Sequence, residues 1–172
     1  MGESIMNQDY LEAQMHLEEK DLRQYSPLVL AYIGDGVFEL IIRTIMVRQD
    51  NSPVQKLHRR TSTLVKAENQ AEMIDRMMEH LTEEEVAVYR RGRNARSCTK
   101  AKNASTGTYR KATGFEALIG YLYLQKKTER IIDLVKIGLE GEDFKRVDTH
   151  NHYGEHKEHE KSAKIQSHIY RV

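Results

Sequence analysis

The sequence predicts an all-α protein. Only two of its 172 residues are proline, Pro27 and Pro53, and both stand where a helix can begin. Apolar residues recur at helical spacing along most of the chain, with hardly any of the two-residue alternation of β-strands. The length fits one domain with short extensions. We therefore expect a helical domain over residues 22–141, preceded by an extension (1–21) and followed by a polar, His-rich tail without a stable fold (142–172).

The first expected helix runs from Pro27 to Val47, the most apolar stretch of the chain. It is about as long as a membrane span, but Asp35, Glu39 and Arg43 recur in it at four-residue intervals and so share one helix face. We interpret it as a buried core helix with one polar stripe and not as a membrane segment.

Two further helices are expected between residues 53 and 80. Ser52 directly precedes Pro53 and is a candidate N-cap for a short helix through Arg60. Apolar residues at helical spacing then indicate one helix from Ser62 to His80.

A capping box predicts the next helix. Thr82 is the cap and Glu85 stands at the third helical position, and the helix continues toward Gly92. Residues 93–107 lose the hydrophobic period and are rich in Ser, Thr, Asn, Lys and Gly, so we expect a long loop there. Loops of that length in a compact domain are usually functional.

Two helices complete the expected domain. The first begins within residues 105–109 and ends at Lys127, and its stretch GFEALIGYLYL is apolar apart from Glu116. The second is capped by Thr128 and runs to about Leu139.

The formal net charge of +1 averages two opposed regions. Residues 88–112 contain eight of the 27 basic residues and no acidic one, which leaves 19 basic against 26 acidic residues elsewhere. Cationic and amide side chains bind phosphate oxygens, so this basic segment is a candidate nucleic-acid surface, although a solvated loop is the competing interpretation. The candidate contacts are Arg90, Arg91, Arg93, Asn94, Arg96, Lys100 and Lys102.

Two acidic residues lie in otherwise apolar helices: Asp35, flanked by glycines, and Glu116, four residues before Gly120. A buried carboxylate is costly unless a cation or a hydrogen-bond donor compensates it. Two carboxylates brought together by helix packing would repel each other, and a divalent metal would relieve the repulsion. Composition alone supports equally well an alternative to a metal site, in which the two acids are core residues held in salt bridges, for example with Arg43. The glycines indicate close approach of another helix or of a ligand.

Other features of the sequence indicate the cellular setting. The single Cys98 cannot form an internal disulfide, which favours a reducing, intracellular environment. Residues 1–20 are acidic and lack the basic and apolar regions of a secretory signal. We therefore expect a cytoplasmic protein with no membrane partner. The histidines of the tail do not indicate a specific metal site, because no folded scaffold accompanies them.

Several separate motifs resemble one protein family. YIGDGVFEL, TSTLVKAENQAE and FEALIGYLYL are similar, in order and spacing, to the helices of ribonuclease III catalytic domains. AYIGD, RRGRNARS and TYRKATGFEALIGYLYL resemble the Mini-ribonuclease III branch of that family. The similarity covers residues 22–140.

The resemblance implies a fold and an activity. The fold would be a ribonuclease III endonuclease-domain-like helical bundle, all-α and homodimeric. Asp35 and Glu116 would be the catalytic and metal-binding residues, with Mg²⁺ as cofactor and Mn²⁺ as its substitute, in an endoribonuclease that cleaves double-stranded RNA and leaves 5′-phosphate ends. The branch matures 23S ribosomal RNA precursors and has no double-stranded-RNA-binding domain. The basic segment would therefore have to bind the RNA.

Two positions depart from the family pattern. Where the family places further acids, four residues before the aspartate and three before the glutamate, this chain has Ala31 and Thr113. Two carboxylates can still hold magnesium, which retains waters and takes substrate oxygens, but the number of ions stays open. The same departures support a rival hypothesis, a non-catalytic RNA- or ribosome-binding module, whereas a helical protein-interaction domain would not need the basic segment. Assistance by a large-subunit ribosomal protein also stays open.

Overall fold

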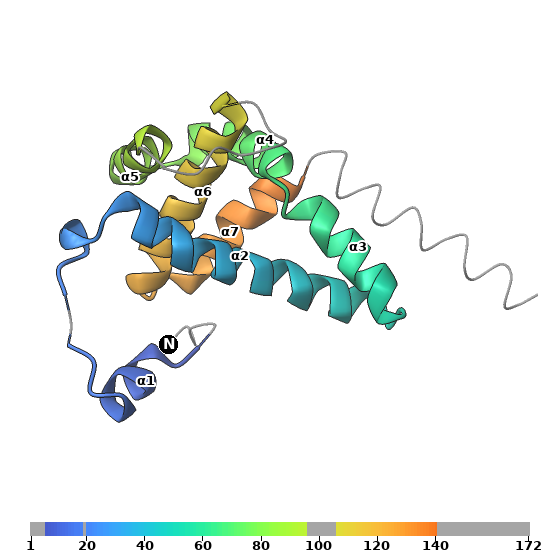
Figure 1. Cartoon of the computed structure of the whole chain (residues 1–172), viewed down its shortest axis with the longest axis horizontal. Coiled ribbons are helices and arrows are strands. Elements are labelled where there is room, and N and C mark those ends of the chain that lie inside the picture. The colour runs from blue at the N-terminus through green and yellow to red at the C-terminus, as the bar shows by residue number, and fades with distance from the viewer. Residues whose placement is uncertain (1–5, 19, 96–105, 141–172) are drawn as a thin grey trace, which may run out of the picture. The chain divides into compact units, whose positions relative to one another are not determined.

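A computed structural model describes residues 6–18, 20–95 and 106–140, which are helical and contain no strand (Figure 1). The chain divides into a unit of residues 1–138 and a second of 139–172, of which only Leu139 and Glu140 are described. The predicted tail therefore lies outside the described residues. In chain order the elements are α1 (Gln8–Gln14), η1 (Leu22–Gln24), α2 (Pro27–Gln49), α3 (Val54–Leu64), α4 (Ala67–Met77), η2 (Met78–His80), α5 (Glu83–Asn94), α6 (Thr106–Leu124) and α7 (Thr128–Leu139).

Helix α6 is the centre of the fold and packs against α2, α4 and α5 (Figure 1). Its residues from Ala112 to Tyr123 are buried except Glu116. The ring of Phe115 meets that of Phe38 edge to face, with centroids 4.9 Å apart. Such pairs add about 0.5–1.5 kcal/mol beyond the area that they bury.

Two glycines allow the backbones of α2 and α6 to touch. A Cβ atom on Gly34 would lie 1.8 Å from the backbone oxygen of Glu116, and one on Gly120 would lie 2.0 Å from that of Leu30. Any larger residue at either position would push the helices apart. The predicted need for close approach is thus confirmed as helix against helix.

Helix α2 begins at Pro27, as predicted, with Ser26 as its N-cap, and it is only partly buried. Its outer face exposes large apolar residues, so the expectation of a core helix with one polar stripe was too simple. No described helix is long and apolar enough to span a membrane. The exposed residues are Leu28, Val29, Tyr32, Leu40 and Val47.

The single helix predicted from Ser62 to His80 is wrong, because α3 ends at Leu64 and α4 starts at Ala67. Side chains at the start of α4 reach back across the break: Asn69 donates a hydrogen bond to the carbonyl of Thr63. The apolar period continues through the break, so periodicity alone does not reveal it. The break makes residues 65–66 a corner between two helices.

Two predicted helix ends also need correction. Ser52 does not cap α3, because its hydroxyl donates to Asp50, and Pro53 precedes the helix without a side-chain cap. Helix α6 ends at Leu124 and not at Lys127, since Lys126 adopts a positive φ of 62° that no helix can continue.

The capping box of α5 is confirmed. The backbone N–H of Glu85 donates to the hydroxyl of Thr82, and the Glu85 carboxylate accepts from the backbone N–H of Thr82. Arg130 of α7 donates to the same carboxylate at 2.8 Å. Because α5 continues to Asn94, residues 93 and 94 are helical and not part of the predicted loop, whose residues 96–105 lie outside the described part.

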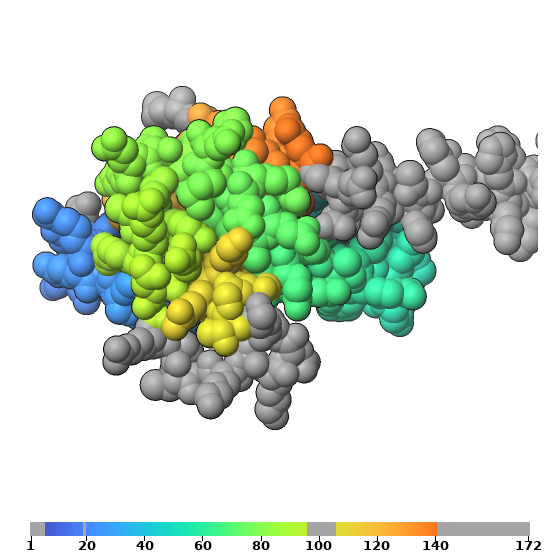
Figure 2. All heavy atoms as spheres, turned by 90° about the horizontal axis from the view of Figure 1, so that it is seen from above, coloured from blue at the N-terminus to red at the C-terminus, as the bar shows by residue number. Residues whose placement is uncertain are grey.

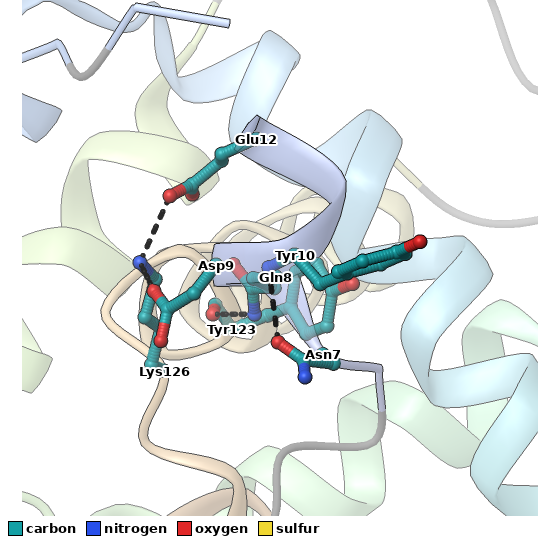
Figure 3. A network of polar contacts seen from close by, with 7 residues as sticks. All are labelled: Asn7, Gln8, Asp9, Tyr10, Glu12, Tyr123 and Lys126. Carbon is teal, nitrogen blue, oxygen red and sulfur yellow. Dashed lines mark hydrogen bonds and ion pairs between the residues drawn. The ribbon is translucent and has the colours of Figure 1, made fainter. Parts of the chain in front are cut away.

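Helix α1 within the N-terminal extension was not predicted. Gln8 is buried and donates a 2.7 Å hydrogen bond to the backbone oxygen of Tyr123, and Lys126 pairs with Asp9 and Glu12 (Figure 3). These contacts anchor the extension to the end of α6. The apolar pattern does not indicate this helix, because its buried residue is a glutamine and its apolar residues are exposed.

Candidate active site

An open pocket of about 460 Å³ lies between α2 and the first half of α6. Asp35 and Glu116 both line it, so the structure brings together the two acids singled out in the sequence. Ala31 and Thr113, the two positions that depart from the family pattern, line the same pocket. Its walls are formed by Leu28, Ala31, Tyr32, Ile33, Asp35, Gly36, Tyr109, Thr113 and Glu116.

The helix contact explains how the pair forms. Gly34 packs on the backbone of Glu116, which sets Asp35, the next residue, beside that position on α6. Ala31 lies one helical turn before Asp35, and Thr113 lies three residues before Glu116, so all four residues face the pocket. Ala31 offers no ligand, and the hydroxyl of Thr113 donates to the backbone oxygen of Tyr109 at 3.0 Å. Asp35 and Glu116 are therefore the carboxylates among the described lining residues.

The pocket raises the pKa of both acids. Burial, followed by the negative charge of Asp35, raises the pKa of Glu116 to about 7, and a hydrogen bond from Gln70 partly opposes this. Burial and the charge of Glu39 raise the pKa of Asp35. The negative charge of one carboxyl opposes ionisation of the other, so the two acids titrate as a coupled pair.

No basic residue of the described chain compensates the two carboxylates by an ion pair. Arg43 instead binds Glu39, with its Nε 3.1 Å from Oε1. The alternative in which Arg43 holds the acids in core salt bridges therefore fails. Two raised pKa values in an open pocket are the arrangement that a cationic ligand would stabilise.

The donor set fits a hard divalent cation. Mg²⁺ prefers oxygen ligands and keeps several waters, so it needs only one or two carboxylates from a protein. Within the described residues there is no cluster of three or more His, Cys, Asp or Glu that could hold a metal. The protein would thus supply Asp35 and Glu116, and water or substrate oxygens would complete the coordination.

The basic segment is only partly described. Arg90, Arg91, Arg93 and Asn94 are exposed on the last turns of α5, beside the beginning of α6 (Figure 2). One of them is already engaged, since Arg91 donates to the backbone oxygen of Tyr25 at 3.3 Å. The remaining candidates, Arg96, Lys100 and Lys102, lie outside the described residues.

The contact between α5 and α6 ties this basic surface to the pocket. Gly92 of α5 packs against Gly114 and Ala117 of α6, on either side of Glu116 in sequence. Lys111, within the acid-free segment, is paired with Asp75 at 2.6 Å and is therefore less available to a phosphate.

Residues 28–127 match the model of the ribonuclease III domain, and this span contains both pocket acids and the helices that position them. The chain belongs to the ribonuclease III family. Mini-ribonuclease 3 of Clostridium tetani is 49% identical over 120 residues, which are 69% of this chain and 80% of that protein. Mini-ribonuclease 3 of a Thermoanaerobacter species is 45% identical over 140 residues, 81% of this chain and 97% of that protein.

A solved structure agrees with this assignment. The crystal structure of a Fusobacterium nucleatum protein matches this ribonuclease III family member with a TM-score of 0.64 and 32% identity, covering 72% of this chain and 99% of that one. Both the predicted all-α fold and the resemblance to Mini-ribonuclease III are thereby confirmed. The chain is a ribonuclease of the ribonuclease III type.

Sequence reasoning missed one polar residue of the site. Gln70 of α4 is 1% exposed, and its side chain partly opposes the rise in the pKa of Glu116. It lies within TSTLVKAENQAE, which carried the family resemblance, but nothing in that pattern shows that its amide turns inward.

Proposed function

We propose that this ribonuclease III family member is a metal-dependent endoribonuclease that cleaves double-stranded RNA. The observation that carries the proposal is the pairing of Asp35 and Glu116 in one open pocket without an ion-pair partner among the described residues. Relatives named Mini-ribonuclease 3 support the same activity. The substrate that we assign is the 23S ribosomal RNA precursor, and the compartment is the cytoplasm.

Asp35 and Glu116 would hold Mg²⁺, or Mn²⁺ in its place, against the scissile phosphate. When bound, such an ion lowers the pKa of a coordinated water and stabilises charge on the phosphate oxygens. Glu116 must lose its proton to act as a ligand, which its pKa of about 7 permits at neutral pH and opposes in acid. Water adds to phosphorus while the bond to the 3′ oxygen breaks and that oxygen takes a proton, which leaves 5′-phosphate and 3′-hydroxyl ends.

The exposed end of α5 would bind the RNA backbone. Arg90, Arg93 and Asn94 can donate to phosphate oxygens from a helix that packs directly beside Glu116. Double-stranded RNA is recognised mostly through its shape and its phosphates, which suits contacts without base readout. In this proposal Arg91, Arg96, Lys100 and Lys102 also bind the RNA.

The outer face of α2 supports a homodimer. Five large apolar residues of this helix are exposed, and Tyr32 among them is 83% exposed beside the pocket. Large apolar side chains exposed on one helix are costly in water and are the kind of surface that a second copy covers. Two copies would bring two pockets to one RNA duplex, one for each strand. A large-subunit ribosomal protein is a further candidate partner.

The test is cleavage of a long RNA duplex by the purified chain with and without Mg²⁺. Asp35→Asn should lower the Mg²⁺-dependent rate by more than about 100-fold, since loss of a ligand exceeds the 10–100-fold effect of outer-shell changes. Glu39→Gln is the matched control, because this acid lies one turn away and is paired with Arg43. Circular dichroism should show an unchanged fold in both variants. Binding of RNA without cleavage by the wild type would favour the non-catalytic module instead.

A further inference from the structure

The pocket between α2 and α6 offers few side chains that could bind a phosphate. Its two acids repel an anion, and none of the described lining residues is lysine, arginine or histidine. Apart from the acids, the side-chain donors in the lining are the hydroxyls of Tyr32, Tyr109 and Thr113. RNA is held largely by donors to its phosphate oxygens, so the availability of these hydroxyls decides how a strand is bound beside the acids.

Two of the three hydroxyls are committed elsewhere. The hydroxyl of Thr113 donates to the backbone oxygen of Tyr109 at 3.0 Å, one helical turn back. Tyr32 is 83% exposed and belongs to the apolar face of α2 that we assign to a second copy. Tyr109 is half-buried, and its hydroxyl has no hydrogen-bond partner among the described residues. Tyr109 therefore carries the hydroxyl that the pocket can offer to a ligand.

Tyr109 and Glu116 lie along one face of α6. Positions 109, 113 and 116 follow one another at spacings of four and three, which places all three in a row that lines the pocket. A helix rises by about 1.5 Å per residue, so Tyr109 lies about 10 Å from Glu116 along the axis. Helical side chains lean in the same direction, which keeps this separation. A phenol there faces a nucleotide beside the one whose phosphate the acids would hold.

Tyr109 also lies near the basic surface of α5. It belongs to the acid-free segment 88–112, and Arg110, the next residue, is exposed. Gly92, between the exposed arginines of α5, packs against Gly114 of α6. The two proposed contacts of the RNA, the end of α5 and the acid pair, thus both border the first half of α6, where Tyr109 lies.

We propose that Tyr109 is an RNA-binding residue of the pocket, whose hydroxyl donates a hydrogen bond to an oxygen of the phosphate next to the scissile one. The inference rests on the proposed function, because it assigns a residue to the substrate of that site. A neutral donor suits this position, since a lysine or arginine beside the two carboxylates would pair with them and compete with a metal ion.

The experiment compares Tyr109→Phe with wild type and with Tyr123→Phe. The control makes the same change near the end of the same helix, outside the pocket lining. The affinity of each full-length chain for a duplex RNA is measured without divalent ions, so that no cleavage occurs. We expect Tyr109→Phe to weaken binding by about 10-fold, as loss of a hydrogen bond to a charged group does, and Tyr123→Phe to leave it unchanged.

Two further readouts separate a phosphate contact from structural damage. The slope of log affinity against log salt should be the same in Tyr109→Phe and wild type, because a neutral hydroxyl displaces no counterion. A methylphosphonate, which lacks one charged oxygen, is then placed in turn at each phosphate flanking the cleavage site. At one of these positions it should weaken binding by the wild type and not by Tyr109→Phe.

The outcomes distinguish this inference from the proposed function. Equal affinity of wild type and Tyr109→Phe overturns the role of Tyr109 while the wild type still cleaves RNA. The same holds if methylphosphonates weaken both proteins equally at every position. A wild type that neither binds nor cleaves duplex RNA overturns the proposed function itself.

Discussion

Replacing Gly34 or Gly36 with alanine, on either side of Asp35, tests the helix contact that creates the site. A Cβ on Gly34 would lie 1.8 Å from the backbone oxygen of Glu116 and 2.7 Å from the nitrogen of Gly120. A Cβ on Gly36 would meet nothing within 4 Å. The same substitution is therefore made twice in one helix, once against backbone and once in open space.

The magnitudes follow from this geometry. Ordinary contact begins at 3.4 Å, so Gly34→Ala must separate the backbones of α2 and α6 by about 1.6 Å at this point. Overpacking of this kind costs about 3 kcal/mol, and alanine returns about 1 kcal/mol of helix propensity, for a net loss of about 2 kcal/mol. Gly36→Ala gains about 1 kcal/mol. The two variants should thus differ by about 3 kcal/mol in their free energy of unfolding.

Urea denaturation followed by circular dichroism measures this difference, at several protein concentrations so that any association is seen. Cleavage of duplex RNA should fall by about 100-fold in Gly34→Ala, because displacement of a reacting group by about 1 Å has that effect. If Gly34→Ala proves as stable and as active as Gly36→Ala, the close approach of α2 and α6 is wrong, and with it the reason that the two acids meet.

Three further predictions concern other parts of the structure. The pKa of Glu116 is raised from 4.5 to about 7 in the fold, so its contribution to stability is present below pH 4.5 and is lost as the pH rises through 7. Without metal, the wild type should therefore lose up to about 3 kcal/mol of unfolding free energy between these pH values, and Glu116→Gln should not. Urea titrations that give both proteins the same dependence of unfolding free energy on pH would contradict the shift. Arg130→Ala should lower the free energy of unfolding by about 3 kcal/mol, because it leaves the buried Glu85 carboxylate without its cation, and a change below about 1 kcal/mol would show that the pair is not structural. Arg93→Ala should reduce the slope of log affinity for duplex RNA against log salt by about 1, whereas Lys136→Ala on α7 should not; identical slopes would remove α5 from the interface.

The sequence predicted those elements whose causes are local. The capping box of Thr82 and Glu85 formed as expected, because both partners lie within one helical turn. The corner at residues 65–66 was missed, because side chains from α4 bind the carbonyls that α3 leaves free, while the apolar period runs on unbroken. Helix α1 was missed because its anchor is a polar contact between Gln8 and a residue 115 positions away.

The same distinction holds for the site. Asp35 and Glu116 could be found in the sequence because a charged residue in an apolar helix is an energetic anomaly that one sequence displays. Gln70 could not be found in the sequence, because a glutamine in a polar stretch is ordinary until the fold buries its amide. Arg91 and Lys111 look free in the sequence, and only the fold reveals their partners at Tyr25 and Asp75.

The tight contact between α2 and α6 has an electrostatic consequence. Because Gly34 and Gly120 bring the two backbones together, Asp35 and Glu116 are kept close and cannot both ionise without cost. Acids at positions 31 and 113 would line the same pocket and would add to the repulsion, whereas Ala31 and Thr113 limit it to a single pair. A ligand that binds only the folded state stabilises that state, so a divalent ion held by this pair would offset the repulsion. The raised pKa of Glu116 and the proposed binding of a cation are therefore two consequences of one helix contact.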